Sequence, residues 1–324
     1  MPDHFISNTH SSGAFAAGAE PVLRIAPGSG ETIGFETDDT VYAQLHEHGD
    51  LEKVTAQINP ITGPVFIENA EPGDTLAVTI HDIKLLDHGW SVYLPGTGAL
   101  AGKMGNQAFS RQIPIRSGEV VLTEHLSVPT QPMIGCIGTA PASGTGSTIM
   151  PTYSFGGNMD LTDAKPGAVV YLPVEVPGAL LSIGDIHAIM ARGESSFVAI
   201  EAQGTAIVSV DIVKSSPSQK TNHTQTAGHQ RIRAPRIETA EEWIFVGLGD
   251  PVQESINRGY EDMFDFLVRD HGWSPSDAYV VMSAVAHSEL GGPTGSTAPD
   301  PLHSMTAVGA VTVHRLPKSV LQND

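Results

Sequence analysis

Three pairs of polar residues interrupt the apolar, strand-like sequence between residues 155 and 201. The pairs are Asn158 and Asp160, Asp185 and His187, and Glu194 and Glu201. Carboxylates, an imidazole and an amide are the groups that bind a catalytic metal ion and move protons in hydrolases. A packed β core normally excludes such groups, because burying a charge without a partner is costly. We therefore ask whether the three pairs meet in one site.

Asp185 and His187 have the spacing of neighbours on one face of a strand. In a β-strand, residues two apart project from the same face and lie about 7 Å apart along the chain. Such a pair can supply two metal ligands or place a carboxylate beside an imidazole. The same spacing also fits a hydrogen-bonded, half-buried pair with a structural role.

The other two pairs have local sequences that can turn them inward. Glu194 follows a short Ala-Arg-Gly turn, which can bring it back beside His187. Glu201 lies within Val-Ala-Ile-Glu-Ala, where a carboxylate needs a partner, a metal ion or an exposed strand end. Asn158 and Asp160 follow Gly-Gly, which permits either an inward-pointing irregular backbone or an ordinary Asx turn.

Other potentially reactive residues have simpler interpretations. His10 precedes a Ser-Ser-Gly loop, and by itself it predicts a solvated side chain. His46 and His48 predict a solvated loop rather than a metal site. The single cysteine, Cys136, lies in an apolar run and is expected to be buried and inert. The sequence has no His-Glu-x-x-His, Cys-x-x-Cys or Gly-x-Ser-x-Gly motif, so zinc-protease, structural-zinc and α/β-hydrolase interpretations lack support.

The elements around these residues are predicted to be mainly strands. Pro-Gly pairs occur at 27–28, 72–73, 166–167 and 177–178, and each predicts a tight turn. The strand-like runs are 32–37, 64–68, 75–83, 119–123, 169–176, 179–189, 196–201 and 205–213. Many short strands between turn signals predict a β-sandwich or barrel-like core.

The pattern becomes helical after Ile237. Apolar residues between 250 and 270 are spaced by four, four, three, one and three residues, which traces one helix face. Ser274-Pro275-Ser276-Asp277 has the N-cap, first-turn proline and acidic residue of a second helix, expected to reach about Ser288. Residues 291–300 predict a loop, and a final strand is expected at 306–314.

We therefore expect an α+β fold that is predominantly β, with two helices in the C-terminal third. A single domain would span residues 1–324. It would contain a β-rich part (1–236), with a helical segment (237–290) and the final strand packed on it.

Composition restricts the partners and the location. The 324 residues carry a formal net charge of −19, which repels phosphate backbones and anionic lipids, so nucleic acid and membranes are not expected partners. Solubility is the simplest role of this charge. No apolar run reaches the ~18 residues of a membrane span. No basic segment precedes an apolar run at the N-terminus, and we expect a cytoplasmic protein.

Blocks along most of the chain, taken in order, resemble the acetamidase/formamidase family. The blocks are 59–65 (Asn-Pro-Ile-Thr-Gly-Pro-Val), 71–76, 135–141, 156–160 (Gly-Gly-Asn-Met-Asp), 172–179, 184–187 (Gly-Asp-Ile-His), 235–239 and 316–319. The resemblance implies a hydrolase that cleaves short aliphatic amides, of the formamide or acetamide type, to a carboxylate and ammonia. It also implies a β-rich fold with helices toward the C-terminal end, a homodimer or higher homo-oligomer, and a bound divalent metal ion.

The resemblance also assigns roles by position. The family's Asn-Met-Asp element falls on Asn158 and Asp160, and its Gly-Asp-x-His element falls on Asp185 and His187. Its Gly-Glu element falls on Glu194, and its Ala-Ile-Glu element falls on Glu201. Its N-terminal Thr-His element falls on Thr9 and His10. The expected metal ligands, for Zn²⁺, are some subset of His10, Asp160, Asp185 and His187. The expected catalytic residues are Glu194, Asn158 and His187. The metal ion would polarise the amide carbonyl and acidify water. Glu194 would carry the proton of that water to the leaving nitrogen, and Asn158 would orient the amide.

One departure from the family pattern leaves alternatives open. Arg192 stands two residues before Glu194, where the family often has Asp. This change could remove a metal ligand or neutralise a substrate carboxylate. It is also compatible with a non-catalytic protein that binds small amides. A third alternative is a metal-free amidase with Cys136 or Ser182 as nucleophile.

Overall fold

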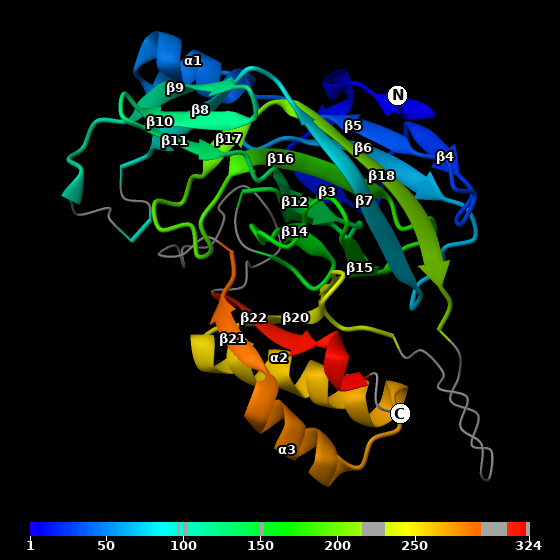
Figure 1. The fold of residues 1–324 in the computed structure, drawn as a ribbon. Coiled ribbons are helices and arrows are strands. Elements are labelled where there is room, and N and C mark those ends of the chain that lie inside the picture. Colours follow the sequence, from blue (N-terminus) through cyan, green and yellow to red (C-terminus); the bar gives the residue numbers. More distant parts are fainter. Residues whose placement is uncertain (96–97, 100–102, 150–151, 216–230, 293–309, 322–324) are drawn as a thin grey trace.

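Most of the chain forms two large β-sheets in a computed structural model of the protein (Figure 1). The structure describes residues 1–95, 98–99, 103–149, 152–215, 231–292 and 310–321. The first sheet has nine strands in the order β1 (His4–Ile6), β5 (Ile33–Glu36), β18 (Gly204–Val213), β7 (Thr75–Leu85), β15 (Val169–Pro173), β19 (Arg236–Glu238), β20 (Glu242–Gly249), β22 (Ala310–Pro317) and β21 (His287–Leu290).

The second sheet has eleven strands. Its main path is β11 (Leu126–Pro129), β10 (Glu119–Thr123), β9 (Phe109–Arg116), β8 (His88–Tyr93), β17 (Ile200–Ala202), β16 (Leu181–Ile189), β12 (Met133–Gly138) and β14 (Gly156–Asn158). Three more strands join it beside β16, namely β6 (Ile61–Ile67), β2 (Ser11–Ser12) and β4 (Leu23–Ile25). A separate two-stranded sheet pairs β3 (Ala14–Ala16) with β13 (Thr145–Ser147).

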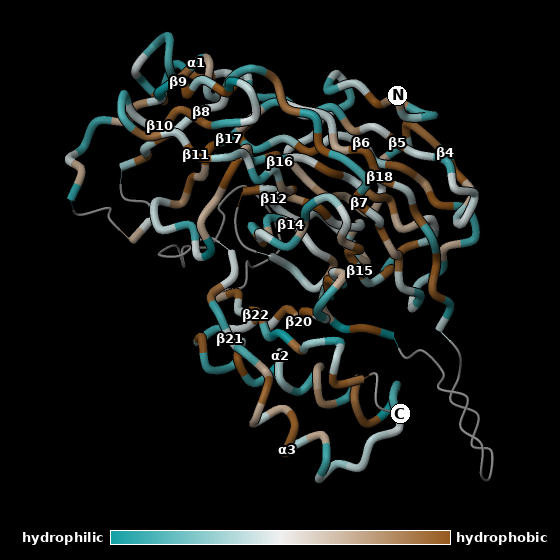
Figure 2. The backbone as a smooth tube through the Cα atoms, viewed as in Figure 1, coloured by the Kyte–Doolittle hydropathy of each residue, from teal (hydrophilic) through white to brown (hydrophobic). Residues whose placement is uncertain are grey.

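The two large sheets share one hydrophobic core. Phe35 and Val78 from the first sheet and Ile134 and Ile183 from the second belong to the same buried cluster. Hydrophobic segments follow the strands of both sheets in Figure 2. This arrangement confirms the predominantly β fold. The alternating run 75–83 predicted β7, and the strand-like run 205–213 predicted β18.

The two C-terminal helices are also confirmed. They are α2 (Val252–Asp265), which continues into a π-helical segment (Phe266–Asp270), and α3 (Pro275–Val285). Ser274 caps α3 by accepting a hydrogen bond from the Asp277 N–H. α2 packs on β20 and β22, below the two sheets in Figure 1.

Several boundaries differ from the sequence predictions. The helix expected to reach Ser288 ends at Val285, because residues 287–290 pair with β22 as an edge strand. The segment 237–290 begins with strands β19 and β20 rather than with a helix. Of the strand predicted at 196–201, only Ile200–Ala202 is a strand. Most of the predicted loop and residues 306–309 of the final strand lie outside the described residues.

One helix was missed. The region of His46 and His48, predicted as a solvated loop, is helix α1 (Thr40–His48). Val41 and Leu45 are its buried residues. Gly49 adopts the left-handed conformation and ends the helix with a hydrogen bond to the Leu45 carbonyl. The glycine stop was the available signal. Short 3₁₀ turns occupy Asn8–His10, Leu51–Lys53 and Lys318–Leu321. No helix in the described ranges is long and apolar enough to cross a membrane.

The contact between α2 and β22 leads to the first testable prediction. A Cβ atom at Gly259 would lie 2.1 Å from Cδ2 of His314. His314 is buried, and Ser288 and Thr312 hold its ring through hydrogen bonds of 2.7 and 2.9 Å. We expect Gly259→Ala to lower the free energy of unfolding by about 1–3 kcal/mol, because the ring cannot move aside.

Urea unfolding measures this change. Alanine normally stabilises a helix relative to glycine, so a stabilised Gly259→Ala protein would contradict the packing argument. Gly18→Ala is the control, since no atom lies within 4 Å of a Cβ at that position.

Candidate metal centre

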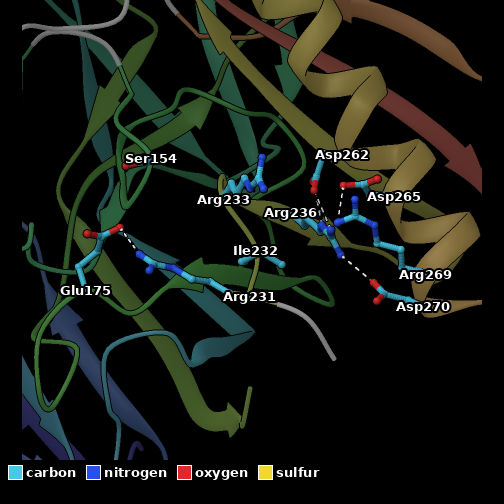
Figure 3. Close-up of a pocket in the computed structure, with 10 residues that line it drawn as sticks. All are labelled: Ser154, Glu175, Arg231, Ile232, Arg233, Arg236, Asp262, Asp265, Arg269 and Asp270. Carbon is cyan, nitrogen blue, oxygen red and sulfur yellow. Dashed lines mark hydrogen bonds and ion pairs between the residues drawn. The ribbon is translucent and has the colours of Figure 1, made fainter. Parts of the chain in front are cut away.

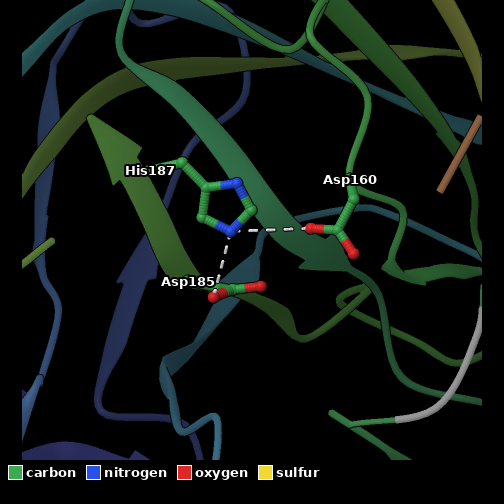
Figure 4. Close-up of side chains that lie close together, drawn as sticks. All are labelled: Asp160, Asp185 and His187. Atoms are coloured by element: carbon green, nitrogen blue, oxygen red, sulfur yellow. Dashed lines mark ion pairs between the residues drawn. The ribbon is translucent and has the colours of Figure 1, made fainter. Parts of the chain in front are cut away.

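His187 lies at the centre of the candidate site and faces acidic side chains (Figure 4). Its Nε2 atom is 3.3 Å from Oδ1 of Asp185 and 3.6 Å from Oδ1 of Asp160. Asp185 and His187 come from β16, and Asp160 follows β14, which is two strands away in the same sheet. All three side chains are at least 95% buried, since the most exposed of them shows 5% of its surface.

Two glutamates complete the cluster. Glu201 pairs with His187 across β17 and β16, and its Oε2 atom is 3.3 Å from Nε2 of His187. Glu194 is buried, and it offers a ligand atom within 4.8 Å of ligand atoms of His187 and Glu201. The structure therefore brings together five of the six polar residues singled out in the sequence. Asp160, Asp185 and His187 also each offer a ligand atom, and these three atoms lie within 4.8 Å of one another.

The backbone carries three of the carboxylates in an unusual conformation. Asp160, Asp185 and Glu194 have φ values of 46°, 58° and 38°. Residues with a side chain rarely adopt this left-handed region, and such strain concentrates at functional sites. The backbone at Asp185 is therefore not that of a regular strand, in which residues simply alternate between the two faces. This irregular backbone places the Asp185 carboxylate beside His187.

Gly135 on β12 provides the space that the carboxylates occupy. A Cβ atom there would lie 2.6 Å from Oδ1 of Asp160 and 2.6 Å from Oδ2 of Asp185. The Gly135 carbonyl also accepts hydrogen bonds from the backbone N–H groups of Met159 and Asp160. Gly135 begins the block 135–141, but no sequence pattern predicted a role for it. Only the pairing of β12 with both β14 and β16 reveals it.

Two further residues, Asn59 and Tyr42, interact with carboxylates of the cluster. The Asn59 side chain donates to Oδ2 of Asp185 at 3.3 Å and to the Thr148 carbonyl at 2.6 Å. Helix α1 supplies Tyr42, and burial together with the Glu201 carboxylate raises the pKa of its hydroxyl well above the usual value. Asn59 lies in the block 59–65 that resembles the family. The position of Tyr42 near the cluster could not be predicted, because helix α1 was not predicted.

Burial strongly affects the ionisation of the cluster. It raises the pKa of Asp160 to about 7, with help from the Asp185 carboxylate. Burial, with the Asp160 carboxylate second, raises the pKa of Glu194, and burial also raises that of Glu201. For His187, burial acts to lower the pKa, but Glu201 and Asp185 raise it well above the usual value. Although burial also opposes the charge of Asp185, His187 holds the pKa of that carboxyl below its usual range.

These shifts have one physical cause. Four carboxylates and one imidazolium leave an excess of negative charge in a medium that solvates charge poorly. Several buried atoms are also without a hydrogen-bond partner among the described residues. They include Oδ1 of Asp160 and Oε2 of Glu201. A divalent cation bound by oxygen atoms and an imidazole would satisfy both deficits, so the residues present fit such an ion.

Asn158 and His10 were also predicted for the site, but neither belongs to the groups of candidate ligand atoms. Asn158 is buried on β14, and its Nδ2 atom donates to the Ile149 carbonyl. His10 is exposed on the 3₁₀ turn and belongs to neither group of candidate ligand atoms. The ligand role of His10 stays a prediction.

Cys136 is buried as expected, in a cluster with Phe15, Ile61, Tyr153 and Phe155. Burial, with the carboxylates of Asp185 and Asp160, raises the pKa of its thiol well above the usual value. This environment disfavours the reactive thiolate. Ser182, the other nucleophile considered from the sequence, is also buried.

Arg192 binds two protein carboxylates. Its Nη1 atom is 2.9 Å from Asp163, and its Nε atom is 2.8 Å from Glu289. A guanidinium group engaged in this way stabilises the protein around it. The observation does not favour the view that Arg192 neutralises a substrate carboxylate.

A larger cavity lies elsewhere. It has a volume of about 550 Å³ and is located between residues 231–236 and α2 (Figure 3). Its arginines include Arg231, which pairs with Glu175, and Arg236, which pairs with Asp262 and Asp270. None of its lining residues belongs to the His187 cluster. The residues that could bind a metal ion therefore lie in the His187 cluster and not in this cavity.

Comparisons with known proteins agree with the resemblance seen in the sequence. The model of the Acetamidase/Formamidase family matches residues 18–145 and 142–292. A formamidase of Methylophilus methylotrophus is 26% identical over 216 residues, covering 49% of this chain and 52% of that protein. An acetamidase of Mycolicibacterium smegmatis is 28% identical over 222 residues, covering 49% and 54%. The chain spans 52–61% of the length of the curated relatives that it matches.

Solved structures resemble the whole chain. An acetamidase from Bacillus halodurans has a TM-score of 0.81 at 27% identity and covers 98% of both chains. An acetamidase from Yersinia enterocolitica has a TM-score of 0.82 at 26% identity, covering 99% of this chain and 93% of that one. The described fold is thus that of these acetamidases.

The position of Gly135 provides a prediction for metal binding. We expect Gly135→Ala to weaken Zn²⁺ binding by at least about 10-fold, because the new methyl group displaces two carboxylates that can act as ligands. Isothermal titration calorimetry on the folded variant measures the affinity. Ile137→Val, on the same strand, serves as the control. Unchanged affinity in Gly135→Ala would show that Asp160 and Asp185 do not hold the ion together.

Proposed function

This chain belongs to the acetamidase/formamidase family, and we propose that it hydrolyses the carbon–nitrogen bond of short aliphatic amides at the His187 cluster. The observation that carries the proposal is the convergence of one imidazole and four carboxyl groups around a buried point. The family model spans the segments that supply all five residues.

The chemistry of amide hydrolysis explains the need for these groups. An unactivated amide resists attack by water, and its nitrogen leaves only after it gains a proton. A catalyst must stabilise charge on the carbonyl oxygen, activate water and protonate the nitrogen. Acids and a base held at one buried point suit all three tasks.

Asp160, Asp185 and His187 are the proposed ligands of a divalent metal ion, taken to be Zn²⁺, with His10 as a further predicted ligand. When bound, this ion would stabilise negative charge on the carbonyl oxygen and make water more acidic. The two aspartates and the imidazole would hold the ion in place, and the surrounding core would exclude bulk water.

Glu194 is the proposed proton carrier. It accepts one proton from water as the hydroxyl oxygen bonds to the carbonyl carbon, and it then delivers that proton to nitrogen. The carbon–nitrogen bond breaks, and ammonia and a carboxylic acid leave. The acid then loses its proton to water and becomes the carboxylate. Burial raises the pKa of Glu194, which makes its carboxylate a stronger base toward a proton of water.

Asn158 is the proposed substrate-orienting residue. Its Nδ2 atom is occupied by the Ile149 carbonyl, whereas its buried Oδ1 atom has no partner among the described residues. A buried acceptor without a donor is costly, and an N–H group of the amide would satisfy it. This assignment favours primary amides, which have two N–H groups.

The two alternatives have less support. The raised pKa of Cys136 opposes a thiolate nucleophile, and Ser182 makes no hydrogen bond to a histidine among the described residues. Arg192, which had favoured a non-catalytic binding protein, is engaged by Asp163 and Glu289, and Glu194 remains inside the cluster.

Partners and location are further proposals. We propose a small amide as the ligand, a cytoplasmic location, and a homodimer or higher homo-oligomer without nucleic acid or membrane contacts. The oligomer is supported by two exposed apolar residues of α3, Tyr279 and Val280, which are 71% and 63% exposed. Light scattering that gives the mass of one chain at micromolar concentration would contradict it.

The central test is ammonia release from formamide, acetamide and propionamide, with protein of measured metal content. We expect turnover by the metal-loaded protein, loss of turnover after chelation, and recovery when Zn²⁺ is added. Full turnover by metal-free protein would rule out the metal role. No release from any short amide by metal-loaded protein would overturn the amidase proposal.

Glu194→Gln separates proton transfer from metal binding. It keeps the size of the side chain but removes the basic carboxylate, so we expect kcat to fall by about 10²-fold or more while Zn²⁺ binding persists. Glu47→Gln, at an exposed position of α1, is the matched control. Normal turnover by Glu194→Gln would assign the proton transfer to another residue.

A further inference from the structure

Arg192 links two turns that carry residues of the His187 cluster. It lies in the turn closed by the hydrogen bond from the Glu194 N–H to the Ala191 carbonyl, and Glu194 is two residues further along. Its ion-pair partner Asp163 lies three residues after Asp160. The Arg192–Asp163 ion pair therefore connects the backbone that presents Glu194 to the backbone that presents Asp160.

The same two carboxylates bind a second arginine. Arg315 on β22 donates to both Asp163 oxygens at 2.7 and 2.8 Å and to Glu289 at 2.9 Å. It also binds Glu242 on β20 at 2.6 Å. Each of the carboxylates Asp163 and Glu289 thus lies between two guanidinium groups. The antiparallel strand pair β21 and β22 is thereby joined to both turns of the candidate site.

Most of this ion-pair group is buried, although the side chain of Glu289 is 42% exposed. The side chains of Asp163 and Arg315 are 7% and 12% exposed, and that of Arg192 is 21% exposed. Burial acts to raise the pKa of Asp163, but Arg192 and Arg315 hold it below the usual range. Removing one partner of a buried pair leaves charge that the protein cannot solvate. The geometry of the two turns therefore depends on both arginines.

We propose that Arg192 is a positioning residue for Glu194, and that β21 and β22 take part in catalysis by holding Arg192 through Glu289 and Arg315. The proposal rests on the amidase function proposed above. Glu194 needs such a support, because its left-handed backbone is strained and its turn is not part of a regular strand. A displacement of about 1 Å at a catalytic group can cost 10²-fold in rate.

Kinetics with Arg192→Gln and Arg192→Lys test the proposal. We expect Arg192→Gln to lower kcat on the best short amide by about 10-fold or more, with KM within about two-fold and Zn²⁺ content unchanged. Arg192→Lys keeps the charge but lacks the planar fork that spans two carboxylates, so it should restore kcat only in part. A rise in KM at constant kcat would instead make Arg192 a substrate-binding residue.

Arg236→Gln is the matched control. Arg236 is also buried and binds two aspartates, Asp262 and Asp270, but it contacts no residue of the cluster among its described partners. It should lose a comparable amount of stability without the loss of kcat. An equal fall in kcat in both variants would reduce the role of Arg192 to general stability.

Hydrogen exchange provides a readout that does not require activity. We expect Arg192→Gln to speed amide exchange at Glu194 and Phe197, whose N–H groups donate to the Ala191 and Glu194 carbonyls, while Arg236→Gln leaves these amides unchanged. If the wild type hydrolyses no amide, faster exchange would still confirm the positioning role. Unchanged exchange and unchanged kcat would overturn it.

Discussion

The structure depends on a concentration of buried charge around His187. Its Nε2 atom lies 3.3–3.6 Å from three carboxylates, and a fourth carboxylate, Glu194, is buried beside them. Four acids and one imidazole cannot all be charged in a poorly solvating interior without further positive charge. Burial therefore raises the pKa of Asp160, Glu194 and Glu201. This cost is the reason to expect a cation at the site, and it links the fold directly to the proposed chemistry.

The surrounding elements adopt locally unfavourable conformations in order to position this cluster. Three acidic residues adopt left-handed backbone conformations, and β12 contributes a glycine where any side chain would collide with two carboxylates. The two-sheet core offsets these penalties with its large buried apolar surface. At the C-terminal side, Arg192 and Arg315 hold two site-bearing turns through shared carboxylates. The candidate site is thus supported by strands that are distant in sequence.

Sequence patterns predicted the fold where the physical signal is local. The alternating run 75–83 predicted β7, the strand-like run 205–213 predicted β18, and the Ser-Pro-Ser-Asp cap located the start of α3. The convergence of Asp160, Asp185, His187, Glu194 and Glu201 followed from residue types and family resemblance. The roles of Gly135, Asn59 and Tyr42 could not be predicted, because they arise from strand pairing and from packing between segments far apart in the chain. Helix α1 is weakly amphipathic, which is why its glycine stop was the main signal.

We propose that the buried acids and His187 bind a metal ion on which amide hydrolysis depends. Anomalous diffraction at the zinc absorption edge, on crystals of Zn²⁺-loaded protein with measured amidase activity, tests it most directly. We predict a single strong anomalous peak beside Nε2 of His187, between the carboxylates of Asp160 and Asp185. Crystals of fully active protein with no peak at this position would contradict the claim.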